Sequence, residues 1–270
     1  MIELNNINKV FNSGTINEVK ALTNINLKVN NGDFITVIGT NGSGKTTLLN
    51  LITGSFMTDT GRILIDGKDV TKEKDYQRAN YISRVFQNPF SGSAPKMTIA
   101  ENLLIAYSRN SRRLPVISLT GKLRSFFRDQ IALLEMQLED RLDNVVGMLS
   151  GGQRQAVTLL MAVLKTPKVL LLDEHTAALD PKSAQQVINL TKRMIEEKKL
   201  TAIMITHSMQ QALDLGSRTL MLYKGEIIDD INAMEKKRLT VDDLLDKFSD
   251  LRKREKLTDD VLSRLKAEYV

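Results

Sequence analysis

Residues 39–46 read GTNGSGKT and match the phosphate-binding pattern G-x-x-x-x-G-K-[S/T]. The β-branched and aromatic run 34–38 predicts a buried strand before this stretch, and residues 46–52 predict a helix after it. The glycines let the backbone turn so that successive N–H groups and the helix N-terminus face an anion. In this setting Lys45 reaches the β- and γ-phosphates and the Thr46 hydroxyl ligates Mg²⁺. A glycine-rich turn of accidental fit is the alternative, but the flanking strand and helix favour a nucleotide site.

Composition limits the classes of protein to which this chain belongs. Its 270 residues are 42% hydrophobic and 26% charged, which is typical of a globular protein that has no run of about 20 apolar residues for a membrane helix. The N-terminus has no signal-peptide pattern, and the lack of cysteine excludes disulfides and thiolate chemistry. The formal net charge is +6, but the basic residues are scattered among 32 acids and aromatics are only 5%. We interpret this charge as a solvated surface compatible with a nearby membrane, and expect no nucleic-acid partner.

Strand patterns come first in the chain. They cover residues 2–11, 21–29, 34–38, 62–66 and 81–86, with a short helix at 75–78. The turn at 30–33 predicts a hairpin from the second strand into the strand before the phosphate loop. We therefore expect an antiparallel layer near the N-terminus.

From residue 88 to 149 the sequence shows no convincing strand. Thr98 and Glu101 form a capping box that opens a helix, a second helix is expected from Lys122 to Met136, and residues 108–120 predict a long loop between them. This block predicts a helical insertion in an α/β protein.

Alternating helices and strands return after residue 150. The predicted helices cover 153–164, 181–198 and 207–216, and the predicted strands cover 168–173, 200–206, 219–223 and 226–228. This alternation is typical of a parallel sheet covered on both faces. The tail from Thr240 is charged and helix-forming, with an apolar face through Leu244 and Phe248. Packing on the core, dimerisation and contact with a membrane partner are all compatible with that face.

Two acids follow the apolar run 169–172. In phosphate-loop proteins an Asp at the end of such a strand holds Mg²⁺, and Asp173 fits that role. Glu174 is then placed to act on a water at the γ-phosphate. The alternative is a solvated acidic turn after a strand.

The most discriminating string is LSGGQ at residues 149–153. Small residues open a helix here, so the backbone N–H groups form a second anion site, to which Ser150 adds a hydroxyl. Such a turn alone is also typical of an ordinary helix cap.

Five motifs in order make residues 1–230 resemble the ATP-binding subunits of ABC transporters. They are the phosphate loop, Gln87 at a strand end, the LSGGQ signature, Asp173-Glu174 after an apolar strand, and His207 after a later strand. The resemblance implies an α/β P-loop NTPase fold with a RecA-like mixed sheet, an N-terminal antiparallel β-subdomain and an inserted α-helical subdomain. It also implies a core of residues 1–87 and 150–232, a helical subdomain of 88–149 and a tail of 233–270.

The resemblance also implies roles for individual residues. Glu174, Gln87 and His207 are implied in ATP hydrolysis, and Phe11 in stacking on adenine where Tyr is more common in the family. Mg²⁺ is implied to contact Thr46, Gln87 and Asp173. The residues implied to bind ATP are Phe11, Gly39, Asn41, Gly42, Ser43, Gly44, Lys45, Thr46, Thr47, Ser150, Gly151, Gly152 and Gln153. Phe11 as an ordinary core residue and His207 as a structural one remain the alternatives.

The family's signature implies a homodimer. There the signature of one subunit closes over ATP held by the phosphate loop of the other, which completes the charge shell around the γ-phosphate. Two positions depart from the family pattern: Ala178 stands where Ser is frequent in the dimer-contact loop, and His175 stands where Pro is frequent. These departures bear on the dimer interface and not on hydrolysis.

The expected partners follow from the same resemblance. They are membrane permease subunits docking on the helical subdomain near residues 90–98, a second copy of the chain and, indirectly, an extracytoplasmic solute-binding protein. The expected location is the cytoplasmic face of a bacterial membrane. The whole-chain pattern is most similar to importers of aromatic amino acids. An exporter ATPase and a soluble ABC ATPase share the catalytic motifs and stay open as alternatives.

Overall fold

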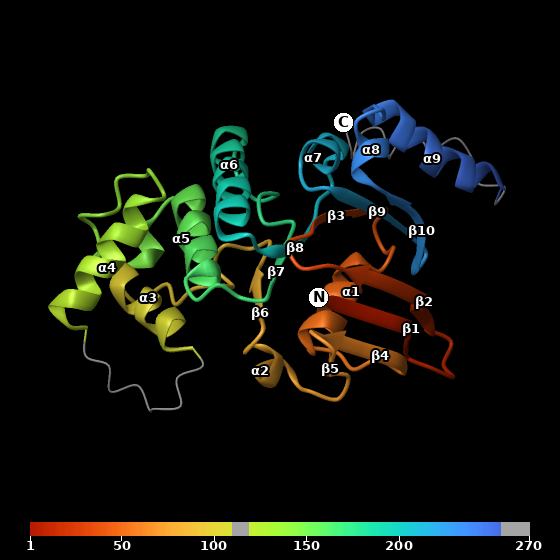
Figure 1. Cartoon of the computed structure of the whole chain (residues 1–270), viewed down its shortest axis with the longest axis horizontal. Coiled ribbons are helices and arrows are strands. Elements are labelled where there is room, and N and C mark those ends of the chain that lie inside the picture. Colours follow the sequence, from red (N-terminus) through yellow and green to blue (C-terminus); the bar gives the residue numbers. More distant parts are fainter. Residues whose placement is uncertain (110–118, 255–270) are drawn as a thin grey trace. The chain divides into compact units, whose positions relative to one another are not determined.

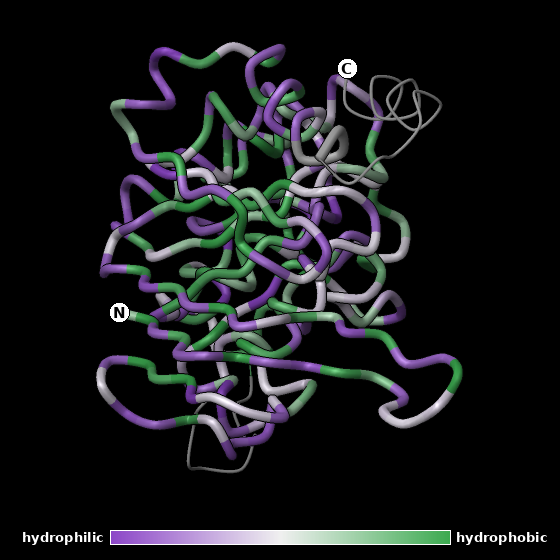
Figure 2. The backbone as a smooth tube through the Cα atoms, turned by 90° about the vertical axis from the view of Figure 1, so that its right-hand side faces the viewer, coloured by the Kyte–Doolittle hydropathy of each residue, from purple (hydrophilic) through white to green (hydrophobic). Residues whose placement is uncertain are grey.

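A computed structural model describes residues 1–109 and 119–254 of the chain (Figure 1). The chain divides into two compact units. The first contains Met1–Arg78 together with the described residues from Thr201 onward, and the second contains Ala79–Leu200. Hydrophobic and hydrophilic stretches alternate along the backbone (Figure 2).

The N-terminal strands form an antiparallel sheet in the first unit. Its strands are β1 (Ile2–Phe11), β2 (Val19–Val29), β4 (Thr60–Ile65) and β5 (Lys68–Asp69), in the order β2-β1-β4-β5. Alternate residues of β2 from Ile25 to Val29 are buried, which is the period-two pattern expected of a sheet with one covered face. The expected antiparallel layer is thus confirmed.

The expected hairpin from the second strand into the phosphate-loop strand is wrong. Strand β2 pairs with β1, whereas β3 (Phe34–Gly39) lies in a different sheet. Every residue of β3 is buried, so it belongs between other strands and not at the edge of a hairpin. The turn at residues 30–33 therefore passes the chain from one sheet to the other.

The strands around β3 form a mixed arrangement. Strand β3 pairs in parallel with β8 (Thr201–Ile205) and with β9 (Arg218–Tyr223), and β9 pairs antiparallel with β10 (Glu226–Ile231). The helices of this unit are α1 (Lys45–Thr53), α2 (Asp75–Arg78), α7 (Met209–Asp214), α8 (Ala233–Lys236) and α9 (Val241–Arg254). Because β3 and β8 are parallel neighbours, their C-terminal ends lie at the same edge of the sheet.

The tail helix α9 packs on the core of the first unit. Leu244 and Phe248 are buried in a cluster with Ile38, Met209 and Ala212. The spacing of four residues puts both side chains on one helix face. Of the roles that the sequence left open, packing on the core is the one that the described residues show.

The second unit holds two parallel strands and the larger helices. They are β6 (Ile82–Val85), β7 (Val169–Asp173), α3 (Ile99–Ser108), α4 (Gly121–Ala132), α5 (Gly151–Val163) and α6 (Pro181–Lys198), with a short 3₁₀ turn at Val146–Met148. Thr98 caps α3 with the capping box that the sequence predicts. In the described part of 88–149, an isolated bridge between Thr98 and Val145 is the extent of strand pairing, as expected. The expected loop 108–120 lies largely outside the described residues.

Helix α4 ends earlier than the sequence predicts. The expected end was Met136, but the helix stops at Ala132. Glu135 and Gln137 adopt the left-handed region, with φ of 56° at each. Such residues cannot continue a right-handed helix, so the apolar run there packs as a turn.

Candidate active site

The phosphate loop joins β3 to α1 in the first unit. A Cβ on Gly39 would lie 2.3 Å from the carbonyl oxygen of Leu222, so this position requires glycine for close backbone approach. Gly42 and Gly44 have φ of 77° and 100°, a region in which other residues are strained. The N-cap of α1 is Gly44, which has no side chain to cap the helix. The loop is thus shaped for an anion at the helix N-terminus.

Lys45 and Ser43 are buried in this loop. The Lys45 ammonium donates hydrogen bonds to the carbonyl oxygens of Gly39, at 2.6 Å, and Thr40, at 3.1 Å. Ser43 Oγ is buried and has no hydrogen-bond partner among the described residues. A buried hydroxyl without a partner is costly unless a ligand satisfies it. Asn41 and Thr46 are exposed and Thr47 is half-buried at the same loop.

His207 follows β8, the parallel neighbour of β3. The Thr206 N–H donates to the Val37 carbonyl at 3.2 Å, so both strands end at one edge. The hydroxyl of Ser208 accepts a hydrogen bond from the Gln211 N–H and caps α7. His207 is therefore held between two fixed neighbours at the edge that carries the phosphate loop.

Phe11 lies at the end of β1 in the antiparallel sheet of the same unit. Its half-buried ring contacts Phe56 edge to face, with centroids 5.3 Å apart and an interplanar angle of 75°. The Lys9 ammonium lies 5.5 Å from the Phe11 centroid. An aromatic ring held in this way has a stacking face to offer.

Gln87, Asp173 and Glu174 lie at or just after the ends of two neighbouring strands in the second unit. Strands β6 and β7 run in parallel with Val85 opposite Leu172, so Gln87 follows one strand end and Asp173 ends the other. Asp173 is buried and pairs with Arg84 at 2.5 Å. Glu174 has φ of 46°, the left-handed region, which turns the chain sharply after the strand.

The signature opens helix α5 in the second unit. Ser150 Oγ accepts the Gln153 N–H and Gln153 Oε1 accepts the Ser150 N–H, both at 3.2 Å, which is a reciprocal capping box. Ser150 and Gly151 are exposed. The Ser150 hydroxyl accepts in this box and so keeps its own proton to donate to an anion.

Comparison with known proteins decides the family. A model of the ABC transporter family matches residues 22–177. A tyrosine transport ATP-binding protein of Clostridioides difficile is 41% identical over 251 residues, which are 92% of this chain and 98% of that protein. The chain belongs to the ABC transporter ATP-binding family. A spermidine/putrescine import ATP-binding protein of Haemophilus influenzae is 36% identical over 235 residues, but they span only 59% of that longer protein.

A solved structure supports the same family assignment. A dimeric ATP-binding cassette in a post-hydrolysis state, bound to ADP and Pi, matches with a TM-score of 0.73 and 28% identity, covering 86% of this chain and 99% of that chain. The P-loop NTPase fold with its antiparallel N-terminal sheet is thereby confirmed. As an ABC ATPase the chain binds and hydrolyses ATP. No helix among the described residues is long and apolar enough to cross a membrane.

The residues of this ABC ATPase fit Mg²⁺ as a companion of the nucleotide. Among the described residues no group of three or more His, Cys, Asp and Glu is arranged to hold a metal. Mg²⁺ needs no such cage, because it is usually bound by one or two protein oxygens together with substrate phosphates. Thr46 and Asp173 supply oxygen donors of the type that it prefers.

His175, which replaces the family's frequent Pro, is a core residue. Its ring is buried, and Nε2 forms a 3.0 Å hydrogen bond with the hydroxyl of Thr191 on α6. Burial lowers the pKa of His175 to about 4, so the ring is neutral near pH 7. The ring contributes to packing against α6.

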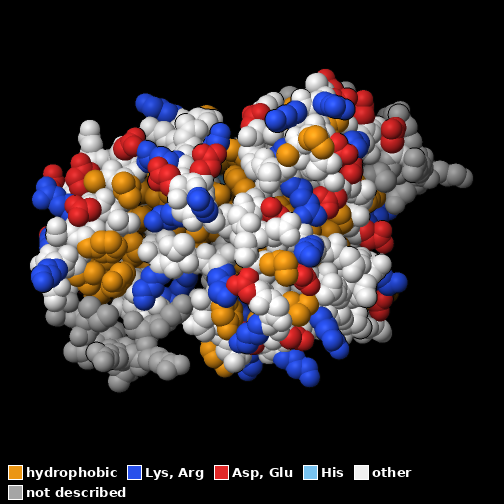
Figure 3. All heavy atoms as spheres, viewed as in Figure 1, with side chains coloured by type: hydrophobic (Ala, Val, Ile, Leu, Met, Phe, Trp, Pro, Cys, Tyr) orange, Lys and Arg blue, Asp and Glu red, His pale blue; other side chains and the backbone are white. Residues whose placement is uncertain are grey.

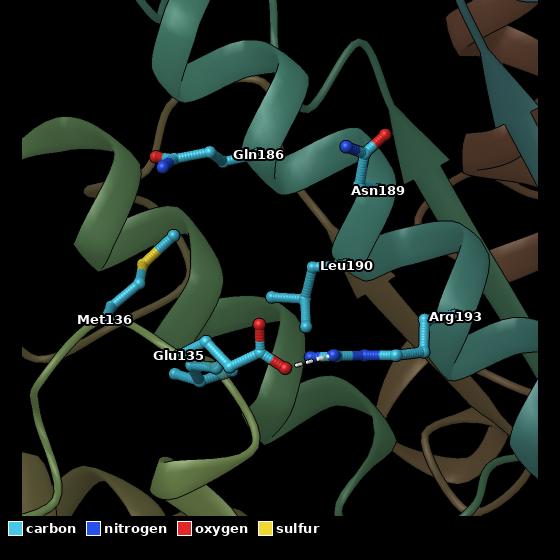
Figure 4. Close-up of a pocket in the computed structure, with 7 residues that line it drawn as sticks. Glu135, Met136, Gln186, Asn189, Leu190 and Arg193 are labelled. Carbon is cyan, nitrogen blue, oxygen red and sulfur yellow. Dashed lines mark hydrogen bonds and ion pairs between the residues drawn. The ribbon is translucent and has the colours of Figure 1, made fainter.

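A pocket of about 280 Å³ in the second unit contains none of the predicted site residues (Figure 4). It lies between α6 and the turn after α4, with Gln186 and Asn189 on one wall and Met136 on the other. Arg193 pairs there with Glu135 and donates to the Leu133 carbonyl. Its charged groups already satisfy one another, and nothing connects the pocket to phosphate chemistry.

Two contacts at the site were not predicted. The first is the ion pair between Arg84 and Asp173. An arginine inside an apolar strand run could have indicated it, because a buried charge needs a partner. Gly152 was assigned to anion binding alone, but a Cβ there would lie 2.8 Å from Ser183 Cβ on α6. Packing therefore requires glycine at this position as well, and no sequence pattern marks such a contact.

Proposed function

We propose that this ABC ATPase powers the import of aromatic amino acids, with tyrosine as the leading substrate. The observation that carries the proposal is the 41% identity to a tyrosine transport ATP-binding protein over nearly the full length of both chains. Polyamine import is the second candidate, because a spermidine/putrescine import ATP-binding protein is 36% identical to this chain. It is the weaker candidate, because the match spans only 59% of that longer protein. The protein acts as a peripheral subunit at the cytoplasmic face of a bacterial membrane, below permease subunits that receive cargo from a solute-binding protein.

The catalytic roles follow the family motifs. Lys45 binds the β- and γ-phosphates, and the family motifs assign to Thr46, Asp173 and Gln87 the oxygen donors that would hold Mg²⁺, which would supply charge neutralisation there. Glu174 acts on the attacking water and His207 contacts the γ-phosphate. Phe11 stacks on adenine. The buried Ser43 hydroxyl without a partner supports an anion in the loop.

The signature acts in trans. Ser150 and Gly151 are exposed, as groups that reach a second chain must be. The dimeric cassette with ADP and Pi is a structural precedent for two chains around nucleotide. ATP then favours the closed dimer, and its hydrolysis removes the contact that distinguishes closed from open.

The docking surface for the permease lies on the second unit. Exposed apolar side chains gather over the region of α3 and α4, at the left of Figure 3. The exposed apolar residues of these two helices include Ile105 on α3 and Phe126 on α4. Phe90 is exposed on the segment between β6 and α3. An exposed apolar patch of this kind marks a protein interface more often than plain surface.

Transport by cells tests the substrate. A strain that lacks the gene should lose uptake of radiolabelled tyrosine, and wild-type protein but not Lys45→Ala should restore it. Loss of spermidine uptake with tyrosine uptake intact would move the assignment to polyamines. Retention of both uptakes would remove the import proposal.

Two purified preparations test the chemistry and the trans arrangement. Glu174→Gln should abolish turnover and retain ATP-driven dimerisation; near-wild-type hydrolysis would remove the role given to Glu174. A mixed dimer with Lys45→Ala in one subunit and Ser150→Arg in the other should keep one working site. Loss of both sites would contradict action in trans.

A further inference from the structure

An exposed phenylalanine lies on a buried arginine beside the signature. Phe90 is 56% exposed, on the segment between β6 and α3, whereas Arg154 on α5 is only 2% exposed. The Arg154 guanidinium carbon lies 3.8 Å from the centroid of the Phe90 ring. At this distance the cation is attracted to the ring face. The Phe90 ring therefore covers one side of the guanidinium. Much of the ring itself remains exposed to solvent.

The same guanidinium holds the turn that leads into the signature. Arg154 Nε donates to the Val146 carbonyl at 3.2 Å, and Nη2 donates to the carbonyls of Gly147, at 2.7 Å, and Leu149, at 3.4 Å. Its Nη1 is buried and has no acceptor among the described residues. The guanidinium is thus held by the hydrogen bonds of Nε and Nη2 and by its contact with the Phe90 ring.

The opposite side of this turn is tied to the segment that carries Phe90. The Val146 N–H donates to the Met97 carbonyl at 2.9 Å, and the Gly147 N–H donates to the Pro95 carbonyl at 2.8 Å. Its carbonyls face Arg154 while its N–H groups face residues 95–97. A displacement of that segment therefore moves the turn through backbone hydrogen bonds and through the stacked ring.

A second contact from α5 fixes the start of the segment. Gln155, next to Arg154, is buried and donates through Nε2 to the Phe86 carbonyl at 3.2 Å. Gly92 packs closely on α5, because a Cβ there would lie 2.4 Å from Thr158 Cγ2. The segment is thus anchored inside the protein at both places, and Phe90 is an exposed residue between the two anchors.

We infer that Phe90 and Arg154 are positioning residues for the signature, and that contact at Phe90 reaches Ser150 through the guanidinium. The inference rests on the proposed function, because the signature's task is to close over ATP held by a second copy. Phe90 belongs neither to the nucleotide site nor to the signature itself. It sets the geometry of the turn from the surface on which we place the permease.

The test measures ATP-driven dimerisation in the Glu174→Gln background by sedimentation over a range of protein concentrations. Phe90→Ala should raise the dimer dissociation constant about tenfold, since the ring contact is lost and water reaches the guanidinium. Phe90→Tyr keeps the ring and should match the parent. Ile105→Ala, which removes a side chain that is 54% exposed on α3, is the matched control and should also match the parent.

Three further measurements separate positioning from general damage. ATP binding by dilute monomer should be the same in Phe90→Ala and the parent, because the phosphate loop is untouched. Amide hydrogen exchange without nucleotide should be faster at residues 146–153 in Phe90→Ala and unchanged in α6. In an Arg154→Met background, Phe90→Ala should cause no additional loss of dimerisation.

Ser150→Arg distinguishes failure of this inference from failure of the proposed function. If Ser150→Arg still dimerises with ATP, the signature does not act in trans and the proposed function fails. If Ser150→Arg blocks dimerisation while Phe90→Ala dimerises as the parent does, the inference is overturned. Equal loss in Phe90→Ala and Ile105→Ala would also overturn it.

Discussion

The phosphate loop and the signature are two glycine-rich turns that open helices, but they are built differently. The phosphate loop opens α1 with Gly44 at the N-cap, buries Lys45 and leaves the Ser43 hydroxyl without a partner among the described residues. The signature opens α5 with a reciprocal capping box and exposes Ser150. The first leaves a buried hydroxyl for a ligand to satisfy, whereas the hydrogen bonds of the second are satisfied within the box, and we propose that it joins a ligand held by another chain.

The two helices are also anchored at opposite ends by buried arginines. Arg78 donates to the carbonyls of Leu51 and Ile52 at the C-terminal end of α1, where a cation is favourable to the helix dipole. Arg154 instead holds the turn before the N-terminal end of α5. The first anchor is remote from the nucleotide, and the second is adjacent to the signature.

The largest expected effect separates binding from closure. Lys45→Ala should weaken ATP binding by the monomer about a hundredfold, because a charge-assisted contact with the phosphates is lost. Ser150→Arg should leave that affinity unchanged and abolish ATP-driven dimerisation. Fluorescent-nucleotide titration and sedimentation measure the two effects. If Ser150→Arg also weakens ATP binding by the monomer, the proposed difference in function between the two turns is wrong.

Removing the α1 anchor should cause the next largest effect. Arg78→Met should lower the free energy of unfolding by about 3–5 kcal/mol, because four backbone carbonyls lose a buried donor. Chemical denaturation measures this loss. Arg62→Met, which removes an exposed arginine from β4, is the control and should change stability little. Equal losses in both variants would mean that Arg78 is not an anchor.

The glycines of the signature should differ from each other. Gly152→Ala should destabilise the protein by about 1–3 kcal/mol, because its Cβ would lie 2.8 Å from Ser183 Cβ. Gly151→Ala meets only Leu179 Cδ2 at 3.3 Å and should be tolerated in stability. Thermal unfolding of both variants measures the difference. If Gly151→Ala is the more destabilised, the packing role of Gly152 is wrong.

An effect of similar size to that of Gly152→Ala concerns a buried lysine in the unit of the phosphate loop. Lys236 donates to the carbonyls of Leu215 and Gly216 after α7, and burial lowers the pKa of Lys236 to about 8. Between pH 8 and 10.5 the unfolded chain binds more protons at this group than the folded one, so its contribution to stability rises with pH. Relative to Lys236→Met, the wild type should gain about 1–3 kcal/mol of unfolding free energy over that range. A difference that is constant with pH would contradict the lowered pKa.

Many elements of this molecule could be predicted from the sequence, because each is specified by residues that are close together in the chain. The phosphate loop, the Thr98 box and the helix from Pro181 are each specified within a few residues, and the structure has them as expected. The hairpin error at residues 30–33 had a different cause. A turn signal states that the chain reverses, but not which sheet it joins, and the buried character of β3 depends on neighbours more than 150 residues away.

The missed contacts of the candidate site share that dependence on distant residues. Arg84 and Asp173 are far apart in sequence and meet because β6 and β7 are parallel neighbours. Gly152 meets Ser183 because α5 packs on α6. The roles of the site residues remain predictions, since they depend on nucleotide and on a second copy.

The capping box has a consequence for selectivity against free anions. In an isolated subunit the Gln153 N–H and the Ser150 N–H are each occupied by the partner side chain of the box. Inorganic phosphate, which is abundant in cells, would have to compete with those two contacts and would gain no adenosine or Mg²⁺ contacts in return. If the signature acts as proposed, the box would make it a weak site for the reaction's own product until a second chain presents a nucleotide.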